Sequence, residues 1–227
     1  MGTLASNRKG FIVGASASSY GPALEISTGT ANDSHSSSAT ALQYFRSSGR
    51  GGGTFRFIRT FLHFDTSGIS GGSDFKLNFT SGGANGGNLS AVTALKHTAG
   101  NNGGELANGD FDLVDPSTPY SSSTAFGTSG TVVIDLNAAA ATAITTTSHL
   151  NIAILLTIDL PGQLEEDPLE NDGDVSNTIN FGNAINLVYT DAASGYSNSV
   201  AGLASGSISK VIEVATANID KVIGSWW

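Results

Sequence analysis

The sequence predicts an antiparallel all-β sandwich, and three observations support this fold class. Hydrophobic residues make up 39% of the 227 residues, which is enough for a buried core. The chain has 29 glycines, and Gly, Ser, Thr and Asn favour turns and strands over helices. Apolar residues recur at every second position in several short segments, as in strands with one buried face. Seven or more such strands separated by turn residues indicate a sandwich.

Four segments show this alternation and are expected to be strands. The longest, Leu150 to Leu160, has aliphatic residues at its even-numbered positions and predicts a long strand with one face on the core. The other three are centred on Leu77, Ile134 and Leu187. Clusters of Gly, Ser or Asn bound each of them, as expected at strand ends.

Two segments depart from simple alternation. In residues 54–65 the apolar positions change from odd to even numbers near Ile58. This change is compatible with a strand buried on both faces and with a strand that carries a bulge near Ile58. Residues 138–144 follow Asn137, a good N-cap residue, and predict one or two helical turns.

The C-terminal part differs in composition and is expected to be separate from the sandwich. We assign residues 1–190 to the sandwich. Residues 191–207 are small and polar and are typical of a flexible linker. Residues 208–227 follow as a C-terminal arm.

The arm contains an approximate 11-residue repeat, in which Ile-Ser-Lys-Val-Ile is followed by Ile-Asp-Lys-Val-Ile. Two short strands that pair over residues 213–218 are the simplest interpretation. The chain then ends in two tryptophans, which are costly to leave in water and are expected to pack on this chain or on a neighbouring subunit. The arm residues assigned to assembly are Ile208, Val211, Ile212, Ile219, Val222, Ile223, Trp226 and Trp227.

Charge and cysteine content exclude several classes of function. Ten basic and 19 acidic residues give a net charge of −9, which disfavours nucleic-acid binding because phosphate contacts need a basic face. The absence of cysteine excludes disulfides, Cys-ligated metal sites and thiol catalysis. The residues 1–6 lack the apolar run of a signal peptide, and residues 150–160 are too polar to span a membrane. We therefore expect no membrane partner and synthesis in the cytoplasm.

Catalytic patterns are missing from the sequence. The four histidines, His35, His63, His97 and His149, do not have the spacing of a helical metal site. No nucleophile elbow, P-loop or dinucleotide fingerprint occurs. We expect a protein that is not an enzyme, and we expect His63, in an apolar strand, to be a hydrogen-bonded structural residue.

An acidic run within residues 165–174 has two interpretations. It contains six of the 19 acidic residues. One interpretation is a calcium site with Glu170, Asp172 and Asp174 as ligands, because calcium prefers several oxygen donors. The other, which we favour, is a solvated loop after the long strand. Apart from this calcium site, no cofactor is expected.

Arginines are also concentrated in one segment, which contains four of the five. They are Arg46, Arg50, Arg56 and Arg59. Because Arg pairs well with carboxylates, the basic and acidic segments predict head-to-tail contacts between copies of the chain. Two alternatives stay open: the segments are independent surface features, or they pair within one subunit.

Several motifs resemble one family of phage proteins. Residues 57–69 resemble the R-x-F-L-x-F-D-T-S-x-I segment of jelly-roll domains that are common in tailed-phage virion proteins and in some carbohydrate-binding modules. Residues 17–26 resemble the first strands of the family, and residues 109–120 are similar to the connection after its central strands. The repeat in the arm resembles short I-S-K-V repeats of phage structural proteins.

The resemblance implies a jelly-roll sandwich in a virion structural protein, most simply a capsid decoration or cement protein. Its expected partners are other copies, in a trimer or larger assembly, and other virion proteins such as the major capsid protein. An alternative is a tail-associated or capsid-surface module that binds host glycans, with Tyr20, Tyr44 and Tyr120 as candidate contacts. The tryptophans that the family carries near its middle are missing here, which weakens this alternative.

Overall fold

The computed structural model describes most of the chain, and the chain divides into two compact units, Met1–Thr190 and Asp191–Trp227. The described residues are 1–34, 41–47, 53–85, 91–100, 103–126, 129–160, 175–181, 185–192, 210–211 and 214–215.

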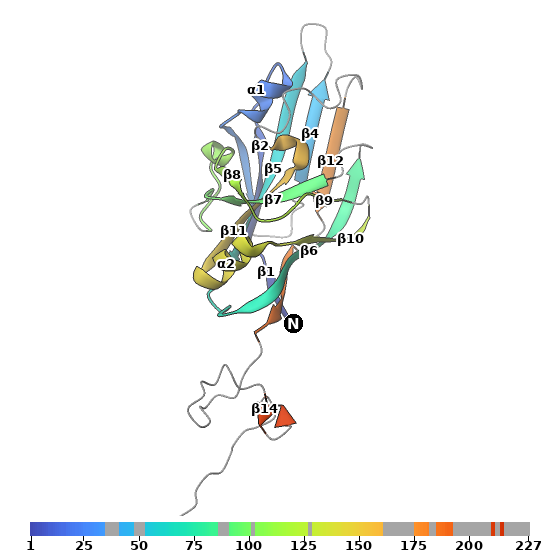
Figure 1. The fold of residues 1–227 in the computed structure, drawn as a ribbon. Coiled ribbons are helices and arrows are strands. Elements are labelled where there is room, and N and C mark those ends of the chain that lie inside the picture. The colour runs from blue at the N-terminus through green and yellow to red at the C-terminus, as the bar shows by residue number, and fades with distance from the viewer. Residues whose placement is uncertain are drawn as a thin grey trace, which may run out of the picture. The chain divides into compact units, whose positions relative to one another are not determined.

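The first unit is an antiparallel β-structure, which confirms the predicted all-β class (Figure 1). Its strands are β1 (Gly2–Ala5), β2 (Arg8–Gly14), β3 (Gly29–Ser34), β4 (Ala41–Ser47), β5 (Thr54–Asp65), β6 (Gly72–Asn85), β7 (Ala91–His97), β8 (Val114–Pro119), β9 (Thr124–Ala125), β10 (Gly130–Asp135), β11 (His149–Leu156), β12 (Val175–Phe181) and β13 (Asn186–Asp191). The helical elements are α1 (Tyr20–Leu24), α2 (Ala138–Thr146) and the 3-10 turns η1 (Asn108–Asp110) and η2 (Thr157–Asp159).

These strands form one hydrogen-bonded system in the order β1-β13-β6-β12-β4-β5-β11-β7-β8. Four further strands attach to it: β10 to β6, β2 to β5, β3 to β2 and β9 to β7. Helix α2 contacts both β11 and β6, which are four places apart in this order. The strands and α2 enclose one apolar core.

Strand β5 is the centre of this arrangement. Both β2 and β4 pair with β5 at Ile58, and both β2 and β11 pair with it at Leu62, so β4 and β11 share one edge of β5 and β2 lies on the other. From Phe57 to Phe64 every residue of β5 is buried. The change near Ile58 from odd-numbered to even-numbered apolar positions therefore marks a strand buried on both faces. The pairing with β2 keeps one register from His63 to Ile58, where it ends.

The predicted strand over residues 150–160 is partly wrong. Strand β11 ends at Leu156, and the chain then turns through η2. Residues 152–156 are all buried, so this strand also has two covered faces rather than one. The even-numbered alternation predicted only one face because Ala153 is small and Leu155 continues the apolar run on the other.

Helix α2 confirms the predicted helical turns after Asn137. The Asn137 side-chain oxygen accepts hydrogen bonds from the backbone N–H groups of Ala139 and Ala140 at 3.0 and 3.1 Å. Its amide nitrogen donates to the carbonyl oxygen of Pro119 at 2.6 Å. One side chain thus caps the helix and joins it to the end of β8.

The second unit contains one short hairpin, in which β14 (Lys210–Val211) pairs with β15 (Val214–Ala215). The prediction that the first repeat pairs with the second is wrong for these two strands, because residues 210–211 of the first repeat pair with residues 214–215, which lie between the repeats. Residues 219–223 of the second repeat lie outside the described part of the chain.

None of the helices in the described part of the chain combines the length and the apolar character needed to cross a bilayer.

We expect Asn137→Ala to lower the free energy of unfolding by about 1 kcal/mol, because two N–H groups of α2 lose their acceptor. Asn137→Asp is the matched control, since it keeps the cap but loses the donor to Pro119, and we expect a smaller loss. Urea denaturation measures both. An Ala variant as stable as the wild type would show that the cap does not hold this helix in place.

Candidate functional site

Polar side chains form a row across four neighbouring strands in the middle of the sheet. Arg8 of β2 lies opposite His63 of β5, and His63 lies opposite Asn151 of β11. Continuing the β11–β7 register by one residue places His97 beside Asn151. Because residues directly opposite in a sheet share a face, these four side chains lie on one face, and we call them the polar row.

A third histidine joins the polar row from β11. His149 is two residues before Asn151 and therefore lies on the same face. Its ring stacks on that of His63, with the ring centres 6.0 Å apart and an angle of 23° between the planes. Three of the four histidines of the chain thus gather here, although they are far apart in the sequence.

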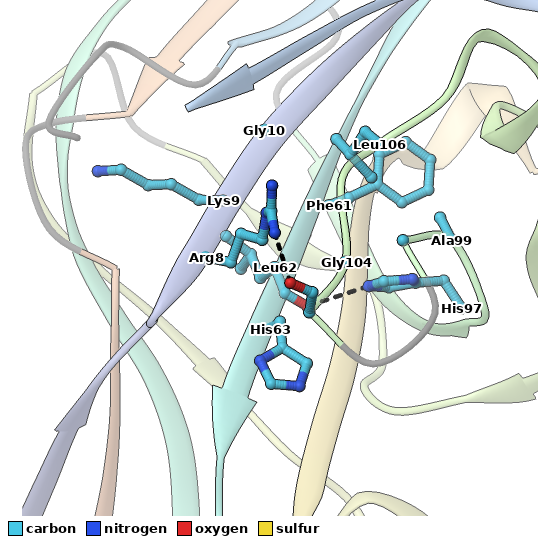
Figure 2. A pocket seen from close by; sticks show the side chains of 12 residues that line it. Arg8, Lys9, Gly10, Phe61, Leu62, His63, His97, Ala99, Gly104 and Leu106 are labelled. Atoms are coloured by element: carbon cyan, nitrogen blue, oxygen red, sulfur yellow. Dashed lines mark hydrogen bonds between the residues drawn. The ribbon is translucent and has the colours of Figure 1, made fainter. Parts of the chain in front are cut away.

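Residues 103–113, which we call the covering segment, pass over the part of the polar row that contains His63. Gly104 and Leu106 of this segment line one hollow together with His63 and His97 (Figure 2). A guanidinium nitrogen of Arg8 donates to the carbonyl oxygen of Gly103 at 2.6 Å. Gly103 has a φ of +97°, and a Cβ there would lie 3.1 Å from the ring of His63. Glycine is required here for both reasons, because the backbone conformation is left-handed and the histidine ring is in close contact.

A buried ion pair fixes the other end of the covering segment. Arg59 of β5 and Asp159 of η2 are 0% and 1% exposed and form two hydrogen bonds, both 2.8 Å long. The remaining terminal nitrogen of Arg59 donates to the carbonyl oxygen of Phe111 at 2.8 Å, and the guanidinium carbon lies 4.1 Å from the centre of the Phe111 ring. This arginine therefore joins β5, η2 and the covering segment.

Burial raises the pKa of Asp159, because a carboxylate without water is disfavoured, and the contact with Arg59 opposes that shift. The two-point geometry is that of a guanidinium paired with a carboxylate. Removal of either partner would leave the other charge buried and uncompensated. The pair is thus a structural connection, and neither group faces solvent.

Two hollows lie beside the polar row. The first, between Arg8, Phe61, His63, His97 and the covering segment, has a volume of about 10 Å³, which is room for about one water molecule (Figure 2). The second has a volume of about 190 Å³ and is large enough for a small polar molecule. Its lining is Lys96, His97, Thr98, Tyr120, Ala143, Thr147, His149 and Asn151.

The buried histidines are neutral at neutral pH. Burial lowers the pKa of His63, and the neighbouring His149 adds to this effect. Burial also lowers the pKa of His97, to about 4. Among the described residues, no three His, Asp or Glu side chains are arranged to hold a metal ion. The prediction that His63 is hydrogen-bonded is confirmed, since its Nδ1 lies 2.6 Å from the side-chain oxygen of Asn7.

The predicted assembly role of Arg59 is wrong, because this side chain is fully buried and paired within its own subunit. Arg56 and Arg59 are three positions apart and so point to opposite faces of β5. Arg46 and Arg56 are half-buried, and each guanidinium lies over a phenylalanine of the neighbouring strand, at 5.9 and 5.2 Å from the ring centre. The three of these arginines that the structure describes therefore do not form one surface.

The structure also corrects the candidate glycan contacts. Tyr20, Tyr44 and Tyr120 are at most 4% exposed, and the first two pack in an aromatic cluster with Phe57. Among the described residues, the exposed large apolar side chains are Met1, Leu113 and Val133, none of which is aromatic. The described surface thus carries no exposed aromatic platform.

Of the other predicted site residues, all but Val211 lie outside the described part of the chain. The calcium candidates Glu170, Asp172 and Asp174 lie outside the described residues, as does Arg50. Of the arm, Val211 lies in β14, whereas the remaining assembly candidates are outside the described part: Ile208, Ile212, Ile219, Val222, Ile223, Trp226 and Trp227.

Sequence reasoning missed Asp159 and the gathering of three histidines. The run that contains Asp159 indicated a solvent-facing residue of a strand, and its partner Arg59 is 100 residues away. One sequence signal was usable. Arg56 and Arg59 are three positions apart, so on any regular strand their side chains point to opposite faces of the sheet.

We expect Arg59→Leu to lower the free energy of unfolding by about 3–5 kcal/mol, because Asp159 stays buried without its partner. Lys76→Ala is the control, since it breaks an exposed ion pair with Asp135 of the same 2.8 Å length and should cost far less. Chemical denaturation of both variants and of Arg59→Leu/Asp159→Leu tests this. We expect the double variant to recover stability, and an Arg59→Leu protein as stable as Lys76→Ala would contradict the assignment.

Searches for related proteins complete the description of the site. No family model and no curated protein sequence matches this chain.

Proposed function

We propose that this chain is a non-enzymatic structural protein of a tailed-phage virion and acts as a capsid decoration or cement protein. The body, residues 1–190, is a jelly-roll sandwich that serves as a rigid plate. The arm, residues 208–227, binds neighbouring copies and other virion proteins such as the major capsid protein. The protein is localised in the virion after synthesis in the host cytoplasm.

The separation of the chain into a compact body and a second unit carries this proposal. The body already buries its apolar strands in one core. The second unit adds a repeat of apolar and lysine residues and both tryptophans, in a length too short for a sizeable core of its own. Such a segment gains most when it packs on another surface, which is what a decoration protein needs from an arm.

The chemistry of the described side chains also supports a structural role. Arg59 and Asp159, which are buried charges, are used to hold the covering segment. His63 and His97 are buried neutral rings with structural hydrogen bonds. Arg59, Asp159 and His63 do not line the 190 Å³ hollow, which supports a structural role for them.

We expect deletion of residues 208–227 to leave the body folded, with an unchanged melting temperature, and to abolish assembly. Sedimentation velocity of the full chain and of the truncated chain measures the oligomeric state. Trp226→Ala/Trp227→Ala is the finer variant and should weaken assembly in the same direction. A full-length monomer, or a truncated chain that still assembles normally, would overturn the proposal.

A glycan-binding module is the second candidate function, and the 190 Å³ hollow is the observation that favours it. Tyr20 and Tyr44 are buried in the core cluster and Tyr120 is 4% exposed, but the polar side chains Lys96, Thr98 and Asn151 line this hollow. These side chains offer hydrogen-bond donors and acceptors to a hydroxyl-rich ligand. The volume exceeds that of a 150 Å³ cavity known to hold benzene, so a single sugar unit is of suitable size.

We expect no glycan to bind at millimolar concentration if the protein only decorates the capsid. Glycan-array binding followed by calorimetry with the matching monosaccharide tests this. Binding that is lost in Thr98→Val, and retained in the distant control Lys76→Ala, would replace the decoration role by host recognition.

A further inference from the structure

Two buried histidines lie beneath the covering segment, and this feature is independent of the proposed function. His63 and His97 are 8% and 3% exposed. Both lie in the polar row, and both line the small hollow below the covering segment (Figure 2). The ring of His97 also packs edge-on against Phe61, with ring centres 5.2 Å apart.

Each ring uses one nitrogen and leaves the other without a hydrogen-bond partner. The Nδ1 of His63 lies 2.6 Å from the side-chain oxygen of Asn7, and the Nε2 of His97 lies 3.0 Å from the carbonyl oxygen of Leu62. Both partner atoms are acceptors, so these two nitrogens carry the proton of a neutral ring. The opposite nitrogens, Nε2 of His63 and Nδ1 of His97, are buried and have no partner atom.

A second proton on His63 would place a buried N–H group at Nε2, which has no partner in the described structure, and this is unfavourable. At His97 a backbone contact with Ala99 favours the second proton, but burial outweighs it and lowers the pKa of the ring. The charged groups around the rings add to this cost. Arg8 of β2 and His149 of β11 face His63 and lower its pKa, and His63 lowers the pKa of His97. Lys96 is next to His97 on β7 and is exposed.

The nearby carboxylates do not remove this cost. Asp65 on β5 is exposed and bonds the backbone N–H of Ser67. Asp110 of the covering segment accepts hydrogen bonds from the backbone N–H groups of Gly100 and Ala107. Glu105 is 85% exposed and lies 3.9 Å from Arg8. Each carboxylate therefore has another partner or lies in water.

We propose that His63 and His97 form an acid-operated clasp, in which protonation of the two rings releases residues 103–107 from the face of β5 while the sheet stays folded. The release is local because residues 108–111 keep their own connections. Asn108 accepts a hydrogen bond from the backbone N–H of Ala31 at 3.0 Å, and the carbonyl oxygen of Phe111 is held by Arg59.

The direction of the pH effect follows from where the protons bind. Burial lowers the pKa of both rings in the closed form, and that of His97 to about 4, whereas an open ring titrates near 6.5. Between about pH 6.5 and 4 the open form binds protons that the closed form does not, so acid favours opening. Other shifted groups do not change charge in this pH range. Asp65 and Asp115 have lowered pKa values and titrate below it, and Lys76 has a raised pKa and titrates above it.

The test is hydrogen exchange of residues 103–107 in the full chain at pH 7.0 and pH 5.0, corrected for the intrinsic exchange rates. The pKa of His97 is about 4 in the closed form and about 6.5 in the open form. This difference alone predicts that protection falls by about 20-fold between pH 7.0 and pH 5.0. His63 adds to this loss. The amides of β5 and β11 should keep their protection at both pH values.

Matched variants identify the groups responsible. His63→Asn keeps a donor at the position of Nδ1, and His97→Gln keeps one at the position of Nε2, but neither side chain titrates. In the double variant we expect equal protection at both pH values. His149→Asn is the control, since His149 is half-buried and bonds Ser148, and it should retain the acid response.

Three results would overturn the clasp. The first is wild-type protection that does not change between pH 7.0 and 5.0. The second is an equal loss across β5 and β11, which would mean global unfolding. The third is an acid response that persists in the double variant. If that variant does not fold, imidazole titration of the wild type by NMR decides the question, because pKa values near 6.5 for both rings would exclude the mechanism.

Discussion

The structure depends on a strand that has no side facing water. Strand β5 is paired along both edges, and from Phe57 to Phe64 both of its faces are covered. A strand so placed needs a partner for every polar side chain that it carries, because a buried polar group without one is costly. Arg59 and His63 are two such side chains, and the partners that they require determine where η2 and the covering segment lie.

This constraint explains why the polar side chains of β5 are paired within the chain. The ion pair between Arg59 and Asp159 connects three segments, and its charges are too deeply buried to meet another molecule. His63 and His97 satisfy one nitrogen each and are kept neutral by their surroundings. The groups that respond to solvent conditions are thus inside the body. The segment proposed to make contacts with other molecules, residues 208–227, belongs to the other unit.

Local patterns in the sequence predicted local structure well. The alternation around Leu77, Ile134 and Leu187 marks β6, β10 and β13, and the cap at Asn137 begins α2. The pattern could not reveal which strands are buried on both faces, because the second face is buried by segments that are distant in the sequence. For β5 such a segment is the covering segment. The partner of Arg59 is likewise a matter of tertiary structure, since Asp159 lies 100 residues away. The resemblance to phage jelly-roll domains remains a prediction about strand order and role.

Hydrogen exchange along β5 at neutral pH tests most directly whether this doubly covered strand organises the body. If it does, the amides of β5 that bond β2, β4 and β11 exchange only through global unfolding, and their exchange free energies equal that of unfolding measured with denaturant. The edge strands β1 and β3, each paired with one neighbour in the described structure, exchange through smaller openings. Amides of β5 that exchange as fast as those of β1 and β3 would contradict this account of the fold.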